Sequence, residues 1–217
     1  MSTIESEALG LLELARAHSR ADRGAESRAV VAELVARYEH DAAPAVRRIV
    51  CRALFGQAKH RLGEGVDRRA VIVDYRHILH IAEREPPIDE VAAEAIYHLG
   101  LTHGKLAIER SSDEHREKSV ERFVEVEQRF CTSSDNAIAY WVARAMLSHA
   151  LTLPLGPAAA AVYERVVTRY ASEPSAELRA HAVLALTRWA ERSSLEGHAV
   201  LASSLAARAA ILARPAP

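Results

Sequence analysis

Residues 31–63 read VAELVARYEHDAAPAVRRIVCRALFGQAKHRLG, and this stretch decides the fold. Its first part carries apolar residues at spacings of three and four, typical of one face of a helix: Val31, Leu34, Val35 and Tyr38. A polar break follows, in which Pro44 suits the first turn of a second helix. The helical spacing then continues from Val46 to Leu62, and Gly63 is placed to end this helix in a left-handed conformation. The stretch therefore predicts a helical hairpin.

A pattern of small residues returns along the chain. In the first helix of each expected pair, alanine is followed by Leu, Ile or Met and then, four positions later, by Ala or Gly. The matches are Ala53-Leu54 with Ala58, Ala95-Ile96 with Gly100, Ala145-Met146 with Ala150, and Ala185-Leu186 with Ala190. In the second helices, residues seven positions apart are mostly bulky: Val31 and Tyr38, Tyr75 and Ala82, Phe123 and Phe130, Tyr163 and Tyr170. Because a ring needs a hole opposite it, the pattern indicates hairpins that pack closely at a period of about forty residues.

This pattern resembles the tetratricopeptide-like repeats, in the version with longer helices found in bacterial proteins. The likeness is carried by residues 28–63 and 158–192. Units of this family have about 34 residues, fewer than the spacing found here. The resemblance implies an all-α fold, namely a right-handed α-solenoid of about five helical hairpins that forms one domain over residues 1–217.

Breaks in the apolar periodicity predict ten helices. We expect the first near residues 4–19, the second to end at 38, the third at 63 and the fourth at 83, and the fifth over 91–109. The later ones open near residues 111, 136, 158 and 174 and after 197. A capping box of Ser111 and Glu114 is expected to start the sixth helix.

Composition limits the function classes. The 28 basic and 29 acidic residues give a formal net charge of −1, which argues against general nucleic-acid or anionic-membrane binding. We expect no membrane span, since no apolar run reaches about 20 residues, and no secretory signal, so a cytoplasmic protein is predicted. Cys51 and Cys131 lie in apolar stripes and are expected to be reduced, buried thiols.

Motifs for catalysis are not found in the sequence. It has no His-Glu-x-x-His, no Gly-x-Ser-x-Gly and no glycine-rich phosphate loop, so we expect neither an enzyme nor a bound cofactor or metal. Among eleven histidines, His77 and His80 share a helical face and would need a third ligand to hold a metal.

The resemblance also implies where a partner binds, because the first helices of such hairpins line a concave groove. Positions beside the small residues then give the candidate partner-binding residues Arg52, Phe55, Lys59, Glu94, Tyr97, Leu101, Arg144 and Leu147. Aromatic and arginine side chains are favoured at interfaces, and the cations suit a peptide carboxylate or an acidic segment. We therefore expect a non-enzymatic scaffold or adaptor that binds a protein or peptide.

Three alternatives stay open. In the first, the protein is a regulatory or sensor subunit whose concave surface binds a small ligand; a closed pocket lined by Tyr97 and Trp141 would favour it. A shift of two residues in register turns Phe55, Tyr97 and Leu147 into ordinary core. The last helix, rich in Ala, Leu and Val, docks a second copy of the chain.

Overall fold

The computed structural model describes residues 2–214, and these form ten α-helices and no strand. The helices are α1 (Thr3–Arg20), α2 (Gly24–Tyr38), α3 (Pro44–Gly63), α4 (Arg68–Ala82), α5 (Asp89–Arg110), α6 (Asp113–Phe130), α7 (Asn136–Thr152), α8 (Pro157–Tyr170), α9 (Ala176–Leu195) and α10 (Ala199–Leu212). The predicted all-α class is confirmed. Among the described residues, no helix combines the length and the apolar character that crossing a membrane requires.

Short polar residues start five of these helices, α1, α4, α6, α7 and α9, because their side chains accept hydrogen bonds from the otherwise unpaired N–H groups of the first turn. In α1, the Ser2 hydroxyl accepts from the backbone N–H of Glu5 at 3.1 Å, and the Glu5 carboxylate accepts from the N–H of Ser2. The predicted capping box at Ser111 is wrong. Ser111 takes a positive φ of 49°, and the next residue, Ser112, caps α6 by accepting from the N–H of His115 at 3.3 Å.

Arginine side chains close several helix ends, a device that the sequence analysis missed. Arg47 of α3 is 1% exposed and donates to the backbone carbonyls of Ile81, Arg84 and Pro86, at 3.1, 2.8 and 2.5 Å, at the end of α4. Arg192 of α9 likewise donates to two carbonyls at the end of α7. A guanidinium offers five N–H donors and a full positive charge, which suits the unpaired carbonyls at the negative end of a helix.

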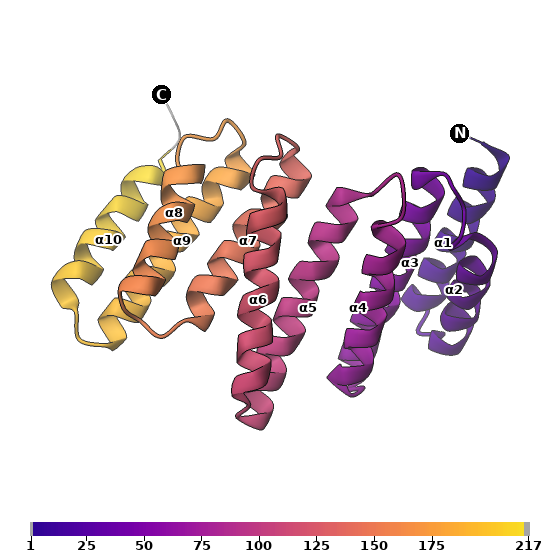
Figure 1. Cartoon of the computed structure of the whole chain (residues 1–217), viewed down its shortest axis with the longest axis horizontal. Coiled ribbons are helices and arrows are strands. Elements are labelled where there is room, and N and C mark those ends of the chain that lie inside the picture. Colours follow the sequence, from indigo (N-terminus) through magenta and orange to yellow (C-terminus); the bar gives the residue numbers. More distant parts are fainter. Residues whose placement is uncertain (1, 215–217) are drawn as a thin grey trace. The chain divides into compact units, whose positions relative to one another are not determined.

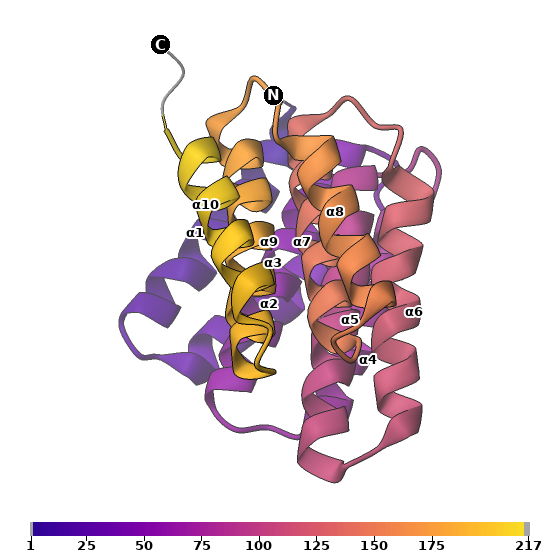
Figure 2. The same ribbon diagram turned by 90° about the vertical axis from the view of Figure 1, so that its left-hand side faces the viewer.

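The chain divides into two compact units, residues 1–102 and residues 103–217. In the first unit, α1, α2 and α3 all contact one another and α4 packs on α3 (Figure 1). In the second unit, α7 contacts α6, α8 and α9, and α10 lies along α9 (Figure 2). Each unit thus consists of consecutive helices that pack on their neighbours in the chain, as expected of helical hairpins.

The residues of the sequence pattern lie in the core of these units. All twelve small and aliphatic residues of the four matches are buried, and so are all eight residues of the bulky pairs. In the second unit, the ring of Tyr163 stacks on Trp189 with centroids 5.8 Å apart, and the Tyr170 hydroxyl donates to the carbonyl of Ala139. Cys51 is buried as expected, whereas Cys131 is half-buried because it stands at the C-terminal end of α6.

Candidate functional site

Three of the predicted partner-binding residues come together in the first unit. The buried carboxylate of Glu94 lies 3.3 Å from a guanidinium nitrogen of Arg52 and 3.7 Å from the ammonium of Lys59. Arg52 also donates to the carboxylate of Glu90 at 2.6 Å. Two cations of α3 and two carboxylates of α5 thus form one ionic cluster, so the cations are neutralised within the chain.

The charge of Glu94 is stabilised by this cluster. Burial alone would raise the pKa of its carboxyl group, but a hydrogen bond with His98 and the charges of Arg52 and Lys59 outweigh burial and lower the pKa. Glu94 is therefore ionised in the folded protein at neutral pH, and its carboxylate positions the Arg52 and Lys59 side chains on α3.

The aromatic candidates and Leu147 lie in the core instead. Phe55 and Tyr97 are each 3% exposed and Leu147 is 5% exposed. The Phe55 ring packs against the rings of Tyr75 and His98, with centroids 6.1 and 5.9 Å apart. A groove drawn through these three side chains is contradicted by their burial, and the shifted register is the better interpretation at these positions.

The other two candidates remain at least partly accessible. Leu101 is half-buried. In the second unit, half-buried Arg144 lies over the rings of Tyr140 and Trp141, with its guanidinium carbon 5.5 and 5.4 Å from the centroids, and it donates to the Tyr140 hydroxyl at 3.1 Å. This stacking fixes the guanidinium plane while leaving part of it open to solvent.

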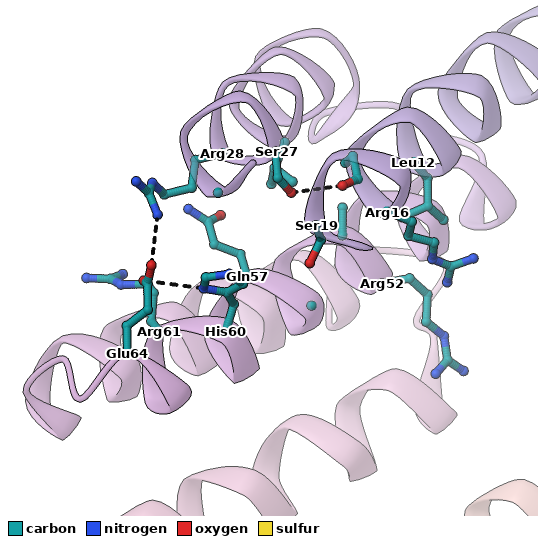
Figure 3. A pocket seen from close by; sticks show the side chains of 15 residues that line it. Leu12, Arg16, Ser19, Ser27, Arg28, Arg52, Gln57, His60, Arg61 and Glu64 are labelled. Atoms are coloured by element: carbon teal, nitrogen blue, oxygen red, sulfur yellow. Dashed lines mark hydrogen bonds and ion pairs between the residues drawn. The ribbon is translucent and has the colours of Figure 1, made fainter. Parts of the chain in front are cut away.

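A cavity of about 100 Å³ lies in the first unit, between α1, α2 and the C-terminal half of α3 (Figure 3). The residues that line it are Leu12, Ala15, Arg16, Ser19, Gly24, Ser27, Arg28, Val31, Arg52, Ala53, Gly56, Gln57, His60, Arg61 and Glu64. Four of them, which are buried, supply apolar walls: Leu12, Ala15, Val31 and Ala53.

Two glycines of the lining play different roles, since one faces open space and the other faces neighbouring side chains. A Cβ added at Gly56, in the middle of α3, would meet no atom within 4 Å. At Gly24, the first residue of α2, a Cβ would lie 3.4 Å from the guanidinium of Arg28 and 3.6 Å from the His60 ring. Gly56 therefore leaves open space beside the cavity, and Gly24 allows the start of α2 to lie close to the C-terminal end of α3.

Charged side chains surround the cavity, and each cation is paired. The guanidinium groups of Arg16, Arg28, Arg52 and Arg61 lie 2.6, 3.3, 2.6 and 2.7 Å from the carboxylates of Glu13, Glu64, Glu90 and Asp74, respectively. His60 lies 3.3 Å from the second oxygen of Glu64, so this carboxylate joins α2 to α3 (Figure 3). Four arginines in the lining thus do not make the cavity strongly cationic.

Two polar side chains of the lining have no hydrogen bond within the described residues, namely Ser19 and Gln57. Figure 3 shows them extending toward the cavity from α1 and α3. The hydroxyl of Ser27, by contrast, donates to the carbonyl of Ala15 at 2.9 Å. The neutral groups that remain available to a ligand are therefore the amide of Gln57 and the hydroxyl of Ser19.

No group of three or more potential metal ligands occurs among residues 2–214. His77 instead lies 2.9 Å from the carboxylate of Glu39, in an ion pair or hydrogen bond between α4 and the end of α2. The sequence matches no model of a protein family, and comparison with curated proteins and with solved structures gives no match.

Proposed function

We propose that this chain is a right-handed α-solenoid of tetratricopeptide-like hairpins that acts as a non-enzymatic scaffold and binds a protein partner. The packing of consecutive helices within each unit and the burial of the recurring small and bulky residues support this proposal. Arg52, Lys59, Leu101 and Arg144 remain candidates for contacts with the partner because their side chains are not fully buried.

The cavity beside Gly56 is the observation that carries the proposal. Small-molecule sites usually enclose about 300–1,000 Å³. An apolar cavity of about 150 Å³ holds a benzene molecule. At about 100 Å³, this cavity has room for one side chain of a partner rather than for a whole cofactor or metabolite. At this cavity, the size thus favours a side chain of a protein partner over a small ligand.

Filling the cavity tests the proposal. Peptides selected on the wild-type protein from a displayed random library would be measured against Gly56→Leu and against the control Gly10→Leu. Both glycines stand within helices where an added Cβ meets no atom within 4 Å, but Gly10 does not line the cavity. We expect Gly56→Leu to weaken binding about tenfold or more and Gly10→Leu to leave it unchanged. If no selected peptide distinguishes the two variants, the proposal is refuted.

Self-association is a second candidate function, favoured by apolar side chains at the end of α9 and on α10. Leu195 and Val200 are each 87% exposed and Ile211 is 66% exposed. Exposed apolar patches of this kind are common at protein–protein interfaces. Analytical ultracentrifugation over a wide concentration range would show a dimer that Val200→Glu dissociates, whereas a monomer at every concentration would exclude this function.

A further inference from the structure

We infer that the cavity between α1, α2 and α3 accepts one aliphatic side chain of an uncharged peptide segment, and that Gln57 and Ser19 bind the adjoining peptide group. This inference rests on the proposed function and specifies the chemistry of the partner. Three features of the cavity support it: the apolar walls, the pairing of the charges and the neutral polar groups.

The walls select an aliphatic side chain. Leu12, Ala15, Val31 and Ala53 supply aliphatic surface that is at least nine-tenths buried in the free protein. The lining contains no Phe, Tyr or Trp. A volume of about 100 Å³ and an opening at Gly56 suit a branched side chain such as leucine.

The charges do not select an anion. Arg61 already donates to both carboxylate oxygens of Asp74, at 2.8 and 2.7 Å, and Arg52 is shared between Glu90 and Glu94. An acidic ligand would have to share each guanidinium with the carboxylate that already pairs with it. The carboxylate of Glu64, itself part of the lining, would repel the ligand as well. An uncharged segment meets neither obstacle.

The unpaired groups match a peptide bond. A glutamine side chain offers an NH₂ donor and a carbonyl acceptor, which correspond to the C=O and N–H of a main-chain amide. Gln57 follows Gly56 on α3, next to the opening, and Ser19 extends from α1 toward the same space (Figure 3). A partner that inserts a side chain beside Gly56 therefore brings its peptide group near the half-buried amide of Gln57, which makes no hydrogen bond within the described residues.

Small model compounds test this inference directly. N-acetyl-L-leucinamide has the aliphatic side chain, two amides and no charge. We expect it to bind with a dissociation constant in the millimolar range and to shift the NMR amide signals of Gly56 and Gln57. N-acetyl-L-alaninamide, which fills less of the cavity, should bind about tenfold more weakly or worse. N-acetyl-L-leucine, which carries a carboxylate, should bind no more tightly, and raising the salt concentration should not weaken the binding of the leucinamide.

Two variants locate the binding. Gly56→Leu fills the cavity and should abolish the shifts. Gln57→Ala removes the side-chain amide and should weaken the binding of N-acetyl-L-leucinamide about three- to tenfold. Gln128→Ala, at an exposed glutamine on α6, is the matched control and should change nothing. Tighter, salt-sensitive binding of N-acetyl-L-leucine, full binding to either cavity variant, or no binding to the wild type would each overturn the inference. The proposed function would survive that outcome if displayed peptides still distinguished Gly56→Leu from Gly10→Leu.

Discussion

The pairing of Arg52 with Glu94 supports the interpretation that the arginines of the first unit serve the fold, and a double-mutant cycle measures it. Glu94→Gln removes the buried charge with little change of shape, and Arg52→Met removes the guanidinium while keeping an unbranched apolar side chain. The atoms involved lie 3.3 Å apart, with the side chain of Glu94 3% exposed and that of Arg52 38% exposed. The pair therefore lies between a buried and a surface ion pair.

The expected coupling follows from this geometry. At 3.3 Å, an effective dielectric constant of about 20 gives a gross attraction of about 5 kcal/mol. Desolvation of the Glu94 carboxylate offsets much of this attraction, and solvent around Arg52 screens part of the rest. We expect a net coupling free energy of about 1–2 kcal/mol. The exposed pair of Arg188 and Glu191, with both side chains about half exposed, should give at most about 0.5 kcal/mol in the same cycle.

Urea denaturation of the four proteins at neutral pH gives the coupling, and repeating it at lower pH tests its origin. Because the pKa of Glu94 is lower in the folded protein, its charge stabilises the fold above about pH 4.5, and this contribution is lost as the pH falls through the folded pKa. The stability difference between the wild type and Glu94→Gln should therefore shrink on acidification. A coupling below about 0.3 kcal/mol at neutral pH would refute the structural role of the pair.

Three further predictions concern other buried groups. Burial raises the pKa of Cys51 to about 12, so a thiol reagent should modify half-buried Cys131 in the folded protein and Cys51 only after denaturation. Burial lowers the pKa of His149, so stability should fall as the pH drops below about 6.5, and His149→Leu, compared by urea denaturation, should reduce that loss. Arg47→Lys keeps the charge but loses the forked guanidinium that donates to three carbonyls. We expect urea denaturation to show that the free energy of unfolding falls by about 2–4 kcal/mol. An unchanged value would mean that lysine makes all three hydrogen bonds.

The spacing of apolar residues was enough to predict the helices, because burial on one face is a property of each helix by itself. Helix ends were predicted less well. Ser111 and Ser112 are adjacent and equally able to cap, and the choice depends on which of them takes the turn conformation. Gly63 is the last residue of α3, and the positive φ of 75° falls two residues later, at Gly65. Local residue preferences thus predicted where a helix ends to within about two residues, but not which residue caps it or takes the positive φ.

The predicted groove failed at Phe55 and Leu147 for a different reason. Sequence periodicity assumes one apolar face and one accessible face for each helix. However, α3 contacts α1, α2 and α4, and α7 contacts α6, α8 and α9, so these helices are covered on more than one side. Residues that periodicity assigns to an open face then lie in a second interface. A pattern of spacing alone cannot show how many neighbours a helix has.

The cavity was not predicted because its defining residue is a glycine within a helix, which sequence reasoning treats only as a weak point of that helix. Nor does the sequence show which charges remain available. The carboxylates that pair with the four arginines of the lining stand between 3 and 42 residues away from them in the chain. Counted alone, these arginines indicate a site for an acidic peptide. However, each of these arginines already pairs with a carboxylate. The neutral groups of Gln57 and Ser19 are then the ones that suit the proposed partner, an uncharged segment with one aliphatic side chain.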